Sequence, residues 1–161
     1  MTYVIATADD MHALGRAIAD HLQPGDLVVL TGDLGAGKTT LTQGIGVALG
    51  VTGDVLSPTF VIARVHRGGR VPLVHVDAYR LGSTVEVDDL DLDASLDESV
   101  TVVEWGEGLV EGLTTDRLLI RITRATDEAD ETRHVDIDGI GMRWASISDA
   151  IAQFAQGPAT T

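Results

Sequence analysis

One eight-residue segment constrains this chain more than any other, because Gly32-Asp-Leu-Gly-Ala-Gly-Lys-Thr39 matches the pattern G-x-x-x-x-G-K-[ST] in full. A continuous apolar run precedes it at residues 27–30, and Leu41, Ile45 and Leu49 follow it at helical spacing, with Gly50 next. The run predicts a strand buried on both faces, and the spacing predicts a helix that begins near Lys38 and ends at Gly50. A strand, a turn and a helix in this order indicate an α/β fold.

The residue types of this segment suit a phosphate-binding loop, or P-loop. Glycines at 32, 35 and 37 let the backbone N–H groups point at phosphate oxygens, and the helix start adds partial positive charge. Lys38, the only lysine of the chain, suits the β- and γ-phosphates. The Thr39 hydroxyl suits Mg²⁺ and Thr40 the α-phosphate, although either threonine could lie nearer the metal. We therefore expect ATP or ADP with Mg²⁺ to bind at Gly32, Asp33, Leu34, Gly35, Ala36, Gly37, Lys38, Thr39 and Thr40.

Two acidic residues stand where a P-loop site needs a metal-side carboxylate. Asp77 closes the strand-like run 73–76 and Glu104 closes the run 100–103, so each should emerge at the sheet edge where phosphates lie. We expect Lys38, Asp77 and Glu104 to be catalytic, and Thr39, Asp77 and Glu104 to hold the metal. Which acid touches it is left open. His75 is expected to be packed or hydrogen-bonded rather than a ligand.

The rest of the chain predicts one α/β domain over residues 1–156, with a frayed tail at 157–161. The pattern favours strands at 3–6, 117–123 and 134–138, a hairpin over 60–77, and a partly helical acidic stretch at 83–99. One helix is expected to begin at a capping box formed by Thr7 and Asp10. A last helix is expected to begin at Ser146 and Asp149, with Ile147, Ile151 and Phe154 on its inner face. The expected architecture is three-layered, with a largely parallel sheet, an antiparallel edge and helices on both faces.

Composition narrows the environment and the partners. The formal net charge of −14 argues against direct binding of DNA or RNA, which normally needs a basic face. Cysteine is absent, which excludes disulfides and thiolate metal sites. The N-terminus lacks the basic start of a signal peptide, and no apolar stretch approaches the roughly 18–20 residues that span a bilayer. We expect a cytoplasmic protein without membrane contact.

The acidic stretch between Arg80 and Arg117 contains no basic residue. Such a stretch is usually a solvated surface, but it could also be a docking face for a basic partner protein. The sequence does not decide between the two.

With these motifs in place, the chain resembles the bacterial TsaE (YjeE) family over most of residues 3–113. The resemblance rests on the P-loop, Ser57-Pro-Thr-Phe60, His75-Val-Asp-Ala-Tyr-Arg-Leu81 and Glu104-Trp105, in family order and spacing. It implies a P-loop NTPase-type fold and an ATPase that resets the TsaB and TsaD proteins during synthesis of threonylcarbamoyladenosine in tRNA, with tRNA held by the partners. It also implies that Asp77 and Glu104 are the metal-side and hydrolysis acids, that Thr59 senses the γ-phosphate, and that Trp105 flanks the site.

Three other functions fit parts of the sequence. A small-molecule P-loop kinase usually has an arginine-bearing lid, for which Arg64, Arg67 and Arg70 are the nearest candidates. A regulatory GTPase needs a lysine in N-K-x-D after the P-loop, and the chain has none. A nucleotide-dependent scaffold would bind ATP without useful turnover. No arginine has a clear finger role, although Arg80 is a candidate, so we expect slow hydrolysis that partners accelerate.

Overall fold

The computed structural model describes residues 1–59, 62–127, 130–147 and 149–151. Its elements are, in chain order, β1 (Thr2–Ile5), α1 (Ala8–Ala19), β2 (Leu27–Thr31), α2 (Lys38–Leu49), β3 (Ala63–His66), β4 (Leu73–Asp77), α3 (Thr84–Asp88), α4 (Asp93–Leu96), β5 (Val100–Glu104), β6 (Arg117–Arg124), β7 (Arg133–Ile140) and the 3-10 helix η1 (Met142–Trp144).

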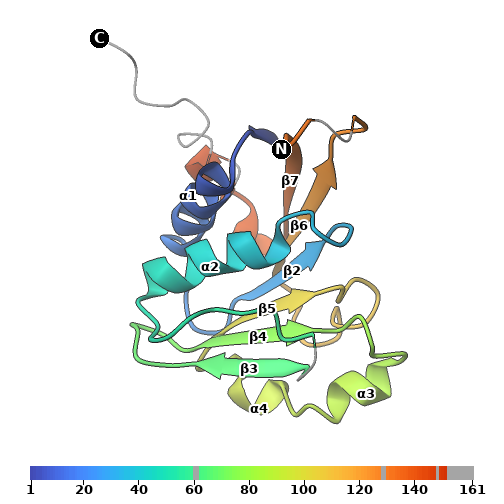
Figure 1. Cartoon of the computed structure of the whole chain (residues 1–161). Helices are drawn as coiled ribbons and strands as arrows, with labels where there is room; N and C mark the ends of the chain where they lie inside the picture. The colour runs from blue at the N-terminus through green and yellow to red at the C-terminus, as the bar shows by residue number, and fades with distance from the viewer. Residues whose placement is uncertain (60–61, 128–129, 148, 152–161) are drawn as a thin grey trace.

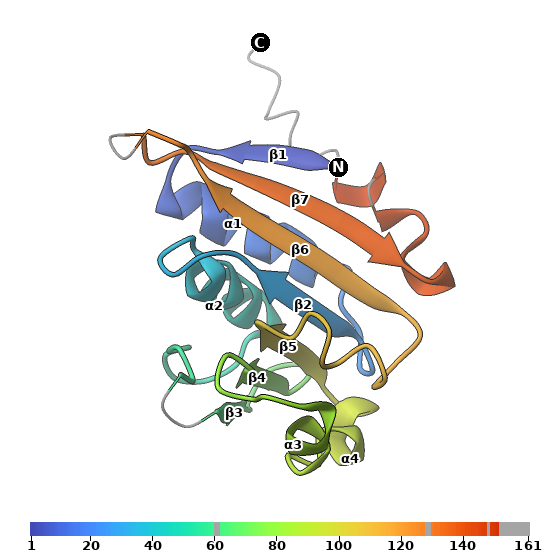
Figure 2. The same cartoon turned by 90° about the vertical axis from the view of Figure 1, so that its right-hand side faces the viewer.

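The strands of the described residues form one seven-stranded sheet in the order β1-β7-β6-β2-β5-β4-β3 (Figure 2). The inner strands β6, β2, β5 and β4 are parallel, whereas β7, β1 and β3 pair antiparallel on the two sides. The predicted parallel sheet with antiparallel edges is therefore confirmed. Because the inner strands share one direction, the loops that follow β2, β4 and β5 meet at one edge, on the right in Figure 1.

Both faces of the sheet are covered, which explains why its central strands are mostly apolar. Helices α1 and α2 cover one face of the sheet (Figures 1 and 2). Val28 and Leu30 of β2 belong to the core beneath these helices, and Leu27 and Val29 belong to the core of the opposite face. Val87 of α3 packs into that second core. Helices on both faces are confirmed, although α3 and α4 are only five and four residues long.

Helices α1 and α2 pack against each other at glycines. The predicted capping box starts α1, with the Thr7 side chain and the Asp10 side chain each accepting from the other's backbone N–H. A Cβ added at Gly44 of α2 would lie 2.3 Å from the backbone oxygen of His12, and one at Gly15 would lie 2.3 Å from that of Leu41. The absence of side chains at these positions lets the two helix backbones come close together.

The predicted elements agree with the observed ones except at their ends. The strand predicted at 134–138 extends over Arg133–Ile140, because β7 pairs with β6 along its whole length. The predicted hairpin forms, with His66 opposite Leu73, and the acidic stretch contains α3 and α4. The last predicted helix is seen at residues 147 and 149–151. Phe60, Phe154 and the tail 157–161 lie outside the described residues.

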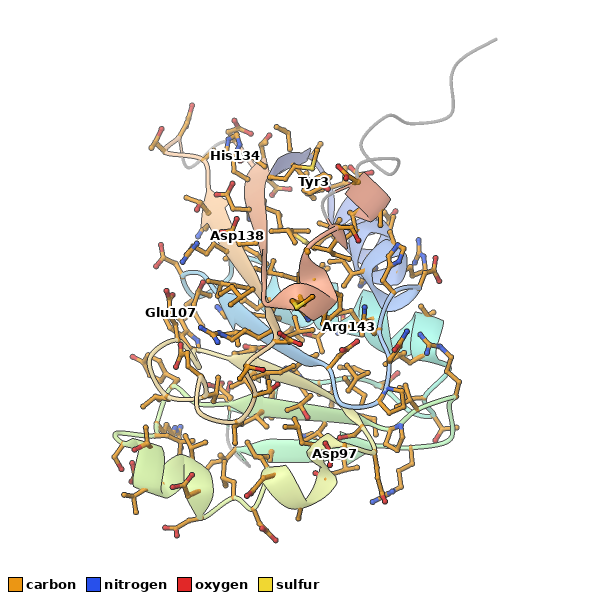
Figure 3. All side chains as sticks on the ribbon, turned by 180° about the vertical axis from the view of Figure 1, so that it is seen from behind. Tyr3, Asp97, Glu107, His134, Asp138 and Arg143 are labelled. Atoms are coloured by element: carbon orange, nitrogen blue, oxygen red, sulfur yellow. The ribbon has the colours of Figure 1, made fainter. Side chains whose placement is uncertain are left out.

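Arg143 of η1 connects the segment after β7 to the turn before β2. Its guanidinium donates to both carboxylate oxygens of the buried Asp26, at 3.1 and 2.9 Å, and to the backbone oxygen of His21 at 2.6 Å (Figure 3). A bidentate pair of this kind fixes orientation as well as distance.

Among the described residues, the helices are too short or too polar to cross a membrane.

Candidate nucleotide-binding site

A cleft of about 570 Å³ opens at the carboxyl ends of β2, β4 and β5. Its lining comes from the loop before α2, the first turn of α2, the segment 57–59 and the residues that follow β4 and β5: Leu34, Gly35, Gly37, Lys38, Thr39, Thr40, Ser57, Thr59, Asp77, Tyr79, Glu104 and Trp105. Parallel α/β sheets bind ligands at this edge, outside the carboxyl ends of their strands. The structure thus brings both expected acids, Thr59 and most of the expected loop into one cleft, whereas Gly32, Asp33 and Ala36 do not line it.

The start of α2 suits an anion. Gly37 precedes the helix in a left-handed conformation with φ of 114°, and no side chain of the described residues caps the first turn of the helix. That first turn also contains no acidic residue. The first N–H groups of a helix have no intrahelical partner, so they and the helix dipole favour a negatively charged group in front of Lys38.

Lys38 points back into its own loop. Its Nζ donates to the backbone oxygens of Gly32 at 2.6 Å and Asp33 at 3.0 Å, and lies 4.5 Å from the centre of the Trp105 ring. The residue is only 5% exposed. Burial lowers the pKa of the Lys38 ammonium below its usual value, while Glu104, Asp77 and Asp33 oppose that shift. The nearby carboxylates therefore offset part of the effect of burial on the Lys38 pKa.

Glu104 contacts the P-loop helix directly. Its Oε1 accepts a hydrogen bond from the Thr39 hydroxyl at 3.3 Å and lies 2.8 Å from His75 Nε2. Glu104 is 3% exposed and stands opposite Leu30 on one side and Asp77 on the other. Strand β5 lies between β2 and β4, which is why Glu104 is the acid that reaches Thr39.

Asp77 faces the segment 57–59. Its Oδ2 accepts from the Thr59 hydroxyl at 2.8 Å, and its Oδ1 accepts from the Tyr79 N–H at 2.9 Å. The hydroxyls of Ser57 and Thr59 are 2.7 Å apart. Thr59 is thus linked to an acid of the cleft.

Trp105 follows Glu104 in a left-handed conformation that non-glycine residues rarely adopt, with φ of 60°. Its N–H donates to the backbone oxygen of Leu30 at 2.9 Å. Its ring lies over the Lys38 ammonium and meets the Tyr79 ring edge-on, with the ring centres 5.3 Å apart. Trp105 therefore flanks the cleft and contacts the P-loop lysine, and is not simply packed in the core.

The oxygen atoms that line the cleft suit Mg²⁺ better than they suit a metal ion held by protein side chains alone. Thr39, Asp77 and Glu104 offer oxygen atoms, which hard cations prefer. The described residues contain no group of three histidine, cysteine or acidic side chains placed to hold a metal by themselves. Mg²⁺ is usually held by one or two carboxylates together with phosphate oxygens and water, so this sparse set suits it.

A smaller cleft of about 170 Å³ adjoins the first. It shares Gly35, Gly37 and Thr40 with the larger cleft and is completed by Ala6, Thr7, Ala8, Met11, Ala36, Glu131 and Arg133. The sequence patterns predicted only a capping box at the start of α1, and they did not indicate Glu131 or Arg133 as site residues. These two residues stand near β7, far along the chain, and no motif marks them.

The sheet has a glycine-rich loop after its central strand β2, and acids end the next two parallel strands, β5 and β4. This arrangement defines a P-loop nucleotide-binding protein. The family model described as threonylcarbamoyl adenosine biosynthesis protein TsaE matches residues 5–135. This chain belongs to the TsaE family.

Individual relatives agree with the family match. The tRNA threonylcarbamoyladenosine biosynthesis protein TsaE of Streptomyces coelicolor is 64% identical over 140 residues, which cover 84% of this chain and 95% of that protein. The protein of the same name from Mycobacterium leprae is 50% identical, over 88% and 89% of the two chains. The crystal structure of Bacillus subtilis YdiB superposes with a TM-score of 0.78 at 32% identity, covering 95% of this chain and 94% of that one. The resemblance seen in the sequence is confirmed.

Proposed function

We propose that this protein binds ATP with Mg²⁺ in the larger cleft and hydrolyses it slowly, and that hydrolysis resets a TsaB–TsaD pair between rounds of tRNA threonylcarbamoyladenosine synthesis. One observation carries the proposal. In a TsaE-family chain, the Thr39 hydroxyl of the P-loop helix contacts the Glu104 carboxylate at the end of the adjacent parallel strand. This contact supports the proposal because it would join a phosphate site to a hydrolysis acid.

Five residues of the cleft have a chemical role in this proposal. Lys38 and the N–H groups before α2 bind the phosphates and stabilise charge that develops on them. Thr39, with Glu104 or Asp77, would hold Mg²⁺, which supplies further charge neutralisation when bound. The other carboxylate would orient the attacking water. Thr59 would report the state of the γ-phosphate, since its hydrogen bond joins Asp77 to the segment 57–59.

The smaller cleft is the proposed site of the nucleoside. It meets the larger cleft at Gly35, Gly37 and Thr40, so a nucleotide with its phosphates at Lys38 can extend its sugar and base between α1 and Arg133. The tRNA substrate would be held by the partners, because the chain carries a net charge of −14.

The kinase alternative loses two of its three candidate lid arginines, Arg67 and Arg70, whereas Arg64 lies in β3. The turn between β3 and β4 precedes β4, so it lies at the opposite edge of the sheet from the carboxyl ends (Figure 1). Arg70 of that turn donates to the backbone oxygens of Ala19 and Leu22, at 2.5 and 3.0 Å. Those contacts hold it at the end of α1, away from Lys38.

The test is release of phosphate from Mg²⁺-ATP by the pure protein, alone and with TsaB and TsaD. We expect slow turnover that rises with the pair and is lost in Glu104→Ala. Glu107→Ala is the matched control, because Glu107 pairs with Arg121 on the exposed surface at 3.2 Å (Figure 3). Turnover indifferent to the pair would remove the proposed pathway, and complex formation that needs ATP but not Glu104 or Asp77 would favour the scaffold.

A further inference from the structure

His75 is an unusual residue for its place in the fold. It lies in the middle of β4, where every position is buried, and is itself 0% exposed. Its strand neighbours are Val74 and Val76. Burying an imidazole in such a strand is unfavourable unless its polar atoms find partners. A histidine at this position therefore needs a hydrogen-bonding partner.

Glu104 is the hydrogen-bonding partner that the described residues offer to His75. Nε2 lies 2.8 Å from Glu104 Oε1, and because a carboxylate offers only acceptors, Nε2 is the donor. Nδ1 is buried and takes no hydrogen bond from the described part of the chain. Among the described residues, the His75 ring thus hydrogen-bonds to one carboxylate oxygen, Oε1 of Glu104.

The sheet register makes this contact specific. His75 stands opposite Val102 and Asp77 opposite Glu104 in the parallel β4–β5 pair. Since side chains two residues apart share a face, His75 lies on the same face as Glu104, one step further from the open edge of the sheet. The ring therefore supports Glu104 from inside the protein, on the side away from the cleft.

The contact leaves one oxygen of Glu104 for other partners. Both His75 and Thr39 engage Oε1, and Oε2 takes no hydrogen bond from the described residues. A glutamate side chain has considerable rotamer freedom, and a charge-assisted hydrogen bond from a buried, immobile donor restricts it. Because Glu104 lines the cleft, this arrangement leaves Oε2 available to a bound ligand.

We propose that His75 is a positioning residue that holds the Glu104 carboxylate in its working orientation. The inference rests on the proposed function of Glu104 at a Mg²⁺-nucleotide site. His75 does not line the cleft, so it acts through Glu104 and not on the nucleotide. Donors of this kind behind a metal-side or catalytic group typically change activity or metal affinity by roughly 10–100-fold when removed.

The experiment compares two amide substitutions that differ in reach. His75→Gln places an N–H group about where Nε2 lies, whereas His75→Asn is one methylene shorter and leaves Oε1 without that donor. His66→Asn is the control, since His66 is a 9% exposed histidine on the neighbouring strand β3 and makes no hydrogen bond to Glu104. Thermal unfolding verifies that all three variants fold.

Two readouts are taken at about pH 8: kcat and KM for Mg²⁺-ATP hydrolysis, and the Mg²⁺ concentration that half-saturates the effect of the metal on ADP binding. We expect His75→Asn to lower kcat or raise the Mg²⁺ midpoint on the order of 10-fold, with KM within about twofold of wild type. His75→Gln should recover most of the loss, and His66→Asn should show none. In a Glu104→Gln background the difference between Asn and Gln at position 75 should vanish.

Equal kcat and equal Mg²⁺ midpoints in His75→Asn and wild type would overturn the positioning role, as would an effect that persists without the Glu104 carboxylate. Wild-type protein that binds ADP but hydrolyses no ATP, with or without the partners, would instead remove the proposed hydrolysis. The Mg²⁺ midpoint alone would then decide the role of His75.

Discussion

The hydroxyl of Thr39 donates a 3.3 Å hydrogen bond to the carboxylate of Glu104, which lies 65 positions further along the chain. This contact joins the first turn of α2 to the end of β5. The contact couples the P-loop to Glu104, because movement of either must disturb the hydrogen bond between them. It also places two oxygen ligands suited to Mg²⁺ side by side.

Replacing Thr39 should separate metal dependence from folding. Thr39→Val removes the hydroxyl, so we expect the Mg²⁺ concentration needed for ATP hydrolysis to rise on the order of 10-fold, and Thr39→Ser to restore it. Thr42→Val is the control, since the buried Thr42 hydroxyl donates to the backbone oxygen of Lys38 at 2.9 Å and bonds no other described residue. A Thr39→Val protein with an unchanged magnesium titration would contradict the assignment.

Lys38→Ala should lose most of its nucleotide affinity. A hydrogen bond from a charged donor contributes about 1.5–3 kcal/mol, so the affinity for ADP should fall roughly 10–100-fold. Titration with a fluorescent ADP analogue measures this. Arg16→Ala removes one positive charge from α1, where Arg16 lines neither of the two clefts, and should leave the affinity near that of wild type. Equal affinities of Lys38→Ala and wild type would exclude the loop as the phosphate site.

His66 should make stability depend on pH. Burial lowers the pKa of the His66 imidazole below its usual 6.5, and the nearby His75 and Arg64 act in the same direction. The unfolded chain therefore binds this proton more readily, so the stability contribution is present above about pH 6.5 and is lost as the pH falls below it.

Urea unfolding between about pH 8 and pH 5 measures this dependence. We expect a smaller loss of unfolding free energy at acid pH in His66→Gln than in wild type. His134→Gln, which removes an exposed histidine of β7, should keep the wild-type slope. If both variants kept that slope, the pH dependence would have to come from other groups.

Gly44→Ala should destabilise the protein although alanine favours helices. The added Cβ would lie 2.3 Å from the backbone oxygen of His12, so α1 and α2 would have to move apart. Overpacking of this kind usually lowers the unfolding free energy by about 1–3 kcal/mol, whereas helix propensity alone would raise it by up to about 1 kcal/mol. Gly112→Ala, whose new Cβ would have no atom of the described residues within 4 Å, should be close to neutral. Equal denaturation midpoints for the two variants would refute close packing at Gly44.

Most of the fold could be predicted from local patterns. The apolar run at 27–30, the helix that ends at Gly50 and the hairpin around residues 68–69 were all readable, because alternation, capping and turn chemistry act over a few neighbouring residues. Asp77 and Glu104 were found for the same reason, since each closes a strand-like run. The ends of β7 were not predicted, because pairing with β6 and not local preference extends that strand.

The sequence by itself determined the phosphate loop, the parallel architecture and the two candidate acids, since each depends on contiguous residues. Only the tertiary structure decided the strand order, which places β5 next to β2 and so brings Glu104 rather than Asp77 to Thr39. It also decided that His75 supports Glu104 and that Arg133 closes the smaller cleft. These relationships join residues distant in sequence, and long-range packing leaves no mark in the neighbouring residues.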